Sequence, residues 1–202
     1  MKAPLGDLHV SNALTYSSVG AALGAMAVVS LPDGRHTAGT LLAAAALLDT
    51  FDGRFARLFT RSARQAAAGR ELDSLADFVN FGVAPAVLLF TWTAWGTPEL
   101  RGLGWIVVLL LAIACALRPA RFNSMLDEER PKWQSNYFTG VPAPAGAIIA
   151  LLPIYADGLG IMRLQSGWGV YLLLAYTLLV AFLMVSTVPP YSGKLLGERN
   201  SR

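Results

Sequence analysis

Four aspartates lie in two close pairs, and their spacing favours a shared metal site. Asp49 and Asp52 are three positions apart, and Asp73 and Asp77 are four positions apart. On α-helices, both spacings place the two side chains on one face. Carboxylate oxygens are the ligands that hard divalent ions such as Mg²⁺ and Mn²⁺ prefer. Two such ions about 4 Å apart would suit displacement at a phosphate, because they stabilise the attacking and the leaving oxygens.

The residues around these acids favour a phosphate-bearing ligand. Gly53 and Ala56 leave the helix face nearly bare, so that a bulky ligand can approach the backbone, and Gly69 permits another close approach. Arg57 supplies a planar cation that suits phosphate. One acidic pair at a membrane edge is more often a solvated helix end. Four acids with interposed Gly, Ala and Arg on consecutive helices are more typical of a functional site.

The elements that position these side chains are predicted to be membrane-spanning helices. Of the 202 residues, 54% are hydrophobic and 14% are charged, whereas soluble domains are about 25% charged. We predict an all-α polytopic membrane protein, with one transmembrane domain over residues 1–202. Roughly 20 apolar residues cross a bilayer, which predicts six spans, at residues 11–31, 37–59, 69–95, 104–121, 141–155 and 168–188. Residues 58–68 are expected to form a loop between the second and third spans.

The basic residues predict how the chain is oriented. With both termini on one side, that side holds thirteen of the 16 Lys and Arg residues, and the other holds only Arg35, Arg101 and Arg163. Because cytoplasmic loops carry the excess of Lys and Arg, we expect both termini and both acidic pairs at the cytoplasmic face of the cell membrane. The basic residues lie at helix ends, so the net charge of +3 fits lipid headgroups or a phosphate-bearing substrate and not nucleic acid.

The acidic pairs and their neighbours resemble the signature of the CDP-alcohol phosphatidyltransferases. The matching residues are Asp49-x-x-Asp52-Gly53-x-x-Ala56-Arg57 and then Gly69-x-x-x-Asp73-x-x-x-Asp77. LDSLADFVNFGVAPA, LRPARFN, FTGVPAPAGA and LMVSTVPPYSGK resemble segments of the phosphatidylserine synthase branch. The resemblance implies an integral membrane enzyme, commonly a homodimer. It would transfer the phosphatidyl group of CDP-diacylglycerol to L-serine and release CMP.

The same resemblance implies a role for each matching residue. Asp49, Asp52, Asp73 and Asp77 would bind Mg²⁺ or Mn²⁺, as two ions, and Asp77 would also act as general base on the serine hydroxyl. The CDP moiety would be bound by Asp49, Asp52, Gly53, Ala56, Arg57, Gly69 and Asp73.

Four later residues are candidates for contact with the acceptor or a phosphate: Arg118, Arg121, Asn123 and Lys194. Membrane anchoring explains the two arginines equally well and explains Lys194 better. Two alternatives remain open. In the first alternative, the acceptor is another alcohol, such as glycerol phosphate or inositol phosphate, whose phosphate Arg118 and Arg121 could bind. In the second, the protein is a divalent-cation transporter, which would leave the Gly, Ala and Arg around the acids unexplained.

Overall fold

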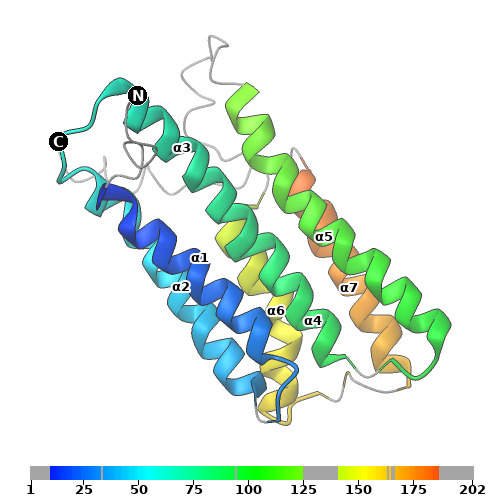
Figure 1. Ribbon diagram of the computed structural model, residues 1–202. Coiled ribbons are helices and arrows are strands. Elements are labelled where there is room, and N and C mark those ends of the chain that lie inside the picture. Colours follow the sequence, from blue (N-terminus) through cyan, green and yellow to red (C-terminus); the bar gives the residue numbers. More distant parts are fainter. Residues whose placement is uncertain are drawn as a thin grey trace, which may run out of the picture.

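The computed structural model describes residues 10–32, 34–93, 95–124, 141–162, 164 and 167–186, and within them all regular secondary structure is helical. This confirms the predicted all-α class. Figure 1 shows the helices as rods lying side by side. In chain order they are η1 (Val10–Asn12), α1 (Ala13–Val28), α2 (Gly34–Ala56), α3 (Ala63–Phe78), η2 (Val79–Val83), α4 (Ala84–Trp92), α5 (Pro98–Ser124), α6 (Ala143–Gly158) and α7 (Trp168–Val185).

Three helical stretches of the described chain are long and apolar enough to cross a membrane. They are Ala63–Trp92, Pro98–Leu117 and Trp168–Val185, and Ala143–Asp157 is a shorter apolar helix. The helix α2 has 23 residues, but the acidic pair Asp49 and Asp52 interrupts its apolar sequence near the end. The six predicted spans thus coincide in order with helical rods, while the number that crosses the membrane stays a prediction.

The third rod begins earlier than predicted, so the expected loop over residues 58–68 is wrong in its second half. Helix α3 starts at Ala63 behind a capping box: the Gln65 N–H donates to the Ser62 hydroxyl at 3.3 Å, and the Ser62 N–H donates to the Gln65 side chain at 3.0 Å. Both bonds satisfy N–H groups that the first helical turn leaves open. The alanines that follow have the highest helix propensity, so the rod extends back over them.

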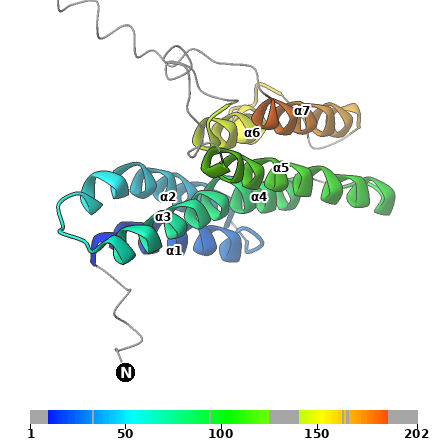
Figure 2. The same cartoon turned by 90° about the horizontal axis from the view of Figure 1, so that it is seen from above.

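Small residues let α1 lie close along α2. Ala22 and Ala25 of α1, and Ala38 and Ala45 of α2, are completely buried, and α1 packs more extensively on α2 than on any other described element. Small side chains allow helix backbones to approach closely in a membrane bundle. Figure 2 shows this pair, with α3 beside it, on one side of the molecule and α6 and α7 on the other, with α4 and α5 between them.

A proline in α6 is compensated by a tyrosine in α7. Pro153 lies inside α6 and has no N–H, so the carbonyl of Ile149, four residues earlier, loses its helical partner. The Tyr176 hydroxyl of α7 donates to that carbonyl at 2.7 Å. A backbone group in an apolar bundle must find such a partner because water is excluded. The bond therefore ties α7 to α6.

The rod α3–α4 contains one π-helical turn, η2, which begins two residues after Asp77. Within it, a Cβ added at Gly82 would lie 3.0 Å from the Cβ of Cys115 and 3.2 Å from the Phe78 ring. Glycine at this position lets α5 approach the turn closely. Such π-turns are rare and occur frequently at functional sites.

Candidate active site

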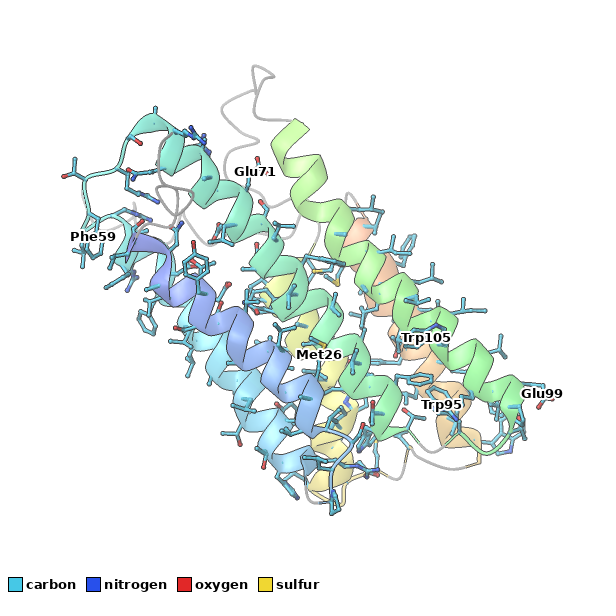
Figure 3. All side chains as sticks on the ribbon, viewed as in Figure 1. Met26, Phe59, Glu71, Trp95, Glu99 and Trp105 are labelled. Atoms are coloured by element: carbon cyan, nitrogen blue, oxygen red, sulfur yellow. The ribbon has the colours of Figure 1, made fainter. Side chains whose placement is uncertain are left out.

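Two helices present the four aspartates at one end of the bundle. Asp49 and Asp52 lie near the end of α2, and Asp73 and Asp77 lie in the second half of α3. Asp49 interacts electrostatically with Asp77, Asp52 and Asp73. Asp73 interacts electrostatically with Asp52. Figure 3 marks this end of the bundle by Phe59 and Glu71, and the opposite end by Trp95, Glu99 and Trp105.

Asp52 is the most deeply buried of the four acids, with 5% of its surface exposed. The Thr15 hydroxyl of α1 donates to its Oδ2 at 3.0 Å. A carboxylate is costly to bury unless it is hydrogen-bonded or paired with a cation. Helix α1 therefore supplies a partner that holds the Asp52 side chain in one orientation.

Asp49 is held in a similar way by the π-helical turn. The Asn80 amide donates to Asp49 Oδ1 at 3.0 Å and to the Ser18 hydroxyl of α1 at 3.1 Å. Asn80 is only 1% exposed, and its own Oδ1 is buried without a hydrogen-bond partner. One amide thus joins three rods at the base of the acidic cluster.

Sequence reasoning missed Thr15, Ser18 and Asn80 as parts of this site. The available signal was polarity, because all three interrupt helices that are otherwise apolar. Nothing in a single sequence shows which of these polar groups faces an aspartate. That depends on the rotation of α1 against α2 and on the extra residue that a π-turn inserts.

The predicted CDP-binding residues lie around the same end of α2 and α3. Gly53 is exposed, and a Cβ added there would meet no heavy atom within 4 Å. The Arg57 Nε donates to the Gly53 carbonyl at 3.1 Å, so the guanidinium lies back over the helix end. A Cβ at Gly69 would lie 3.1 Å from Arg61 Nη1 and 3.4 Å from Asn12 Oδ1. Ala56, half-buried, is the last residue of α2.

The predicted acceptor residues lie beyond what the structure describes in detail. Arg118, Arg121 and Asn123 are on the last turns of α5, where the backbone is described but the side chains are not. Lys194 lies outside the described residues.

A family model for CDP-alcohol phosphatidyltransferases matches residues 8–188. The protein belongs to the CDP-alcohol phosphatidyltransferase family. The match covers both acidic pairs and all the helices described above.

Relatives of this family member carry a more specific name. Three of them are called CDP-diacylglycerol–serine O-phosphatidyltransferase. The Mycobacterium leprae protein is 42% identical to this chain over 154 residues, which cover 74% of this chain and 47% of the relative. The Mycobacterium bovis protein is 39% identical over 183 residues, which cover 88% of this chain and 59% of the relative. The Helicobacter pylori strain 26695 protein is 33% identical over 148 residues, which cover 73% of this chain and 57% of the relative. The chain therefore spans about half the length of the curated relatives it matches.

The CDP-alcohol phosphatidyltransferase family uses divalent metal ions, and the chemistry of the donor set here fits such ions. Four mutually interacting carboxylates repel one another unless cations neutralise them, and hard cations prefer oxygen ligands. The amide nitrogen of Asn80 contacts Asp49, and the Oδ1 of the same amide is buried without a hydrogen-bond partner. Among the described residues, however, no three acidic, histidine or cysteine side chains are arranged so that they could hold one ion. Asp49, Asp52, Asp73 and Asp77 as ligands remain a prediction.

Proposed function

We propose that this protein transfers the phosphatidyl group of CDP-diacylglycerol to L-serine, forming phosphatidylserine and CMP. One observation carries the proposal: α2 and α3 present two interacting pairs of aspartates in a chain whose relatives are named for this reaction. Four acids on two helices are costly in a membrane protein, and intramembrane ionisable residues mark functional sites.

The chain's own residues would act on both substrates. The serine oxygen attacks the lipid-side phosphorus, the phosphorus–oxygen bond to CMP breaks, and CMP leaves with the electron pair. Asp77 takes the hydroxyl proton. Thr15 holds Asp52 in place, and Asn80 holds Asp49. The open backbone at Gly53 admits the nucleotide. Divalent cations bound by the four aspartates would neutralise them and stabilise charge on the attacking and leaving oxygens.

The layout in the membrane forms part of the proposal. Six helices span the cell membrane as one domain, both termini are cytoplasmic, and two chains form a homodimer. The acids then lie at the cytoplasmic face, where a soluble acceptor enters from one side and a diacyl lipid from the bilayer.

The acceptor and the base can be tested together by CMP release. Purified protein with CDP-diacylglycerol is expected to release CMP with L-serine and not with glycerol phosphate or inositol phosphate. Asp77→Asn should lower this rate by roughly 100-fold or more, the contribution of a general base. Glu71→Gln is the matched control, because Glu71 is an exposed acid on the same helix and should keep the wild-type rate.

Each other outcome excludes a specific part of the proposal. Wild-type activity in Asp77→Asn would remove that residue as the base. CMP release with glycerol phosphate or inositol phosphate but not with L-serine would exclude serine as the acceptor. Movement of Mn²⁺ into sealed vesicles without CMP release would favour the transporter.

Metal dependence is the second test of the site. Chelation with EDTA should abolish CMP release, and added Mg²⁺ or Mn²⁺ should restore it, because four clustered carboxylates need cations to bind a pyrophosphate. Glu71→Gln should need the same cation concentration as wild type, while Asp52→Asn should need a higher one. Full activity in EDTA would exclude a metal-dependent reaction.

A further inference from the structure

A cavity of about 710 Å³ lies at the end of the bundle opposite the aspartates. Its lining comes from the start of α2 and from the ends of α1, α4 and α6. The aspartates lie at the other end of α2, so this cavity is separate from the candidate active site. Its volume is within the range of roughly 300–1,000 Å³ typical of pockets that bind small molecules.

The cavity combines an apolar wall with a charged mouth. Leu42, Leu88, Trp92 and Leu151 form buried parts of the wall. At the mouth lie Arg35 and His36, from the first turn of α2, and Asp157 of α6.

The two basic groups at this mouth are available to a ligand. Arg35 and His36 are both exposed, and neither side chain makes a hydrogen bond or ion pair within the described part of the chain. Asp157, half-buried, lines the same cavity and already interacts within the protein. A ligand that matches the two basic groups carries a phosphate, and its remainder is apolar.

We propose that this cavity binds an acyl chain of a phospholipid from the leaflet opposite the active site. The phosphate would lie against Arg35 and His36. Such a lipid is the amphiphile that a bilayer presents at this depth, with its chain directed into the bundle. The inference depends on these helices spanning the membrane, and it is independent of the reaction at the aspartates.

Gly39 offers a way to fill the cavity without disturbing the backbone. It lines the cavity, and a Cβ added there would meet no heavy atom within 4 Å. Gly39→Leu should therefore occupy the space of the acyl chain. Gly102→Leu is the matched control, because Gly102 lies on α5, outside the lining, and has the same open surroundings. Ala43→Leu fills the same cavity from an exposed position of α2 and serves as a second variant.

The experiment uses the full chain in vesicles containing phosphatidylethanolamine with a photoreactive group near the end of one acyl chain. After irradiation, mass spectrometry maps the labelled residues. We expect labels on the cavity-lining parts of α2, α4 and α6 in wild type and Gly102→Leu, and their loss in Gly39→Leu and Ala43→Leu. Arg35→Gln should weaken labelling roughly fivefold, the effect of one cation near a lipid phosphate. Arg101→Gln, at the same end but stacked over the Phe90 ring, should not.

Two results would overturn the inference. Equal labelling in wild type, Gly39→Leu and Ala43→Leu would show that the cavity holds no acyl chain. Equal labelling in wild type and Arg35→Gln would remove the phosphate contact at this end of the cavity. CMP release is measured on the same samples and should be unchanged in every variant, so failure here is distinguishable from failure of the proposed reaction.

Discussion

Thr15 shows how a neutral side chain outside the acidic motif can control a predicted metal ligand. Its hydroxyl is the donor to Asp52 Oδ2, and both side chains are buried. Thr15→Val keeps the shape and removes the donor, so one oxygen of a buried carboxylate loses its partner. Loss of a group that orients a metal ligand typically costs 10- to 100-fold, and we expect CMP release to fall by at least roughly tenfold.

Thr177→Val is the matched control for that substitution. Thr177 is also buried, but its hydroxyl donates to the Leu173 carbonyl of its own helix, far along the chain from the acids. Both variants are compared for CMP release and for the cation concentration that gives half-maximal rate. Thr15→Val should raise that concentration, and Thr177→Val should not. Equal effects in both variants would mean that Thr15 serves packing alone.

At this scale, the sequence identified the four acids as candidates, whose role as ligands stays a prediction, and it missed the side chains that contact them. Asp49, Asp52, Asp73 and Asp77 are recognisable because charge is rare in an apolar chain, and helical spacing brings each pair to one face. Asn80 is not recognisable in this way. Its contact with Asp49 depends on the π-turn between α3 and α4. This turn rotates the following side chains away from the directions that regular α-helical spacing predicts.

At the scale of helices, composition located the helical segments, while a side-chain capping box decided the start of α3. The apolar runs predicted the middle of each rod. The start of α3 was missed because Ser62 and Gln65 form a reciprocal cap, which begins the helix before the predicted span. A capping box is visible in a sequence only when its spacing is considered together with the helix propensity of the residues that follow.

The link between α6 and α7 gives a test of helix packing. Tyr176→Phe removes the donor to the Ile149 carbonyl, which Pro153 leaves open, and should destabilise the protein by about 1–2 kcal/mol. Pro153→Ala restores an N–H within α6, so Tyr176→Phe should cost less in that background. This double-mutant cycle isolates the compensation from other effects of either change.

Thermal unfolding in detergent provides the measurement. Cys115 is the only cysteine of the chain and is buried, so a thiol-reactive dye reports its exposure as the protein unfolds. Tyr171→Phe is the control, because Tyr171 is on the same helix and half of it is exposed. If Tyr176→Phe costs the same with and without Pro153, the tyrosine does not compensate for the proline.

At the scale of the whole molecule, the two ends of the bundle differ in chemistry. One end holds the acids with Thr15, Ser18 and Asn80 around them. The other holds an aromatic group, in which the Phe90 ring lies 5.5 Å from that of Trp95 and 5.0 Å from that of Trp105, and the cavity beside Arg35. Aromatic side chains of this kind collect at membrane–water interfaces. The two ends would therefore face opposite sides of the membrane.

Cysteine labelling can determine which side each end faces. Thr60, between α2 and α3, and Gly96, between α4 and α5, are both exposed and mark the acidic end and the cavity end. In a Cys115→Ala background, Gly96→Cys should react with a membrane-impermeant maleimide on intact cells, and Thr60→Cys only after permeabilisation. The reason is the distribution of Lys and Arg, since basic loops stay in the cytoplasm. The reverse pattern would place the acids outside the cell and would contradict the proposed orientation.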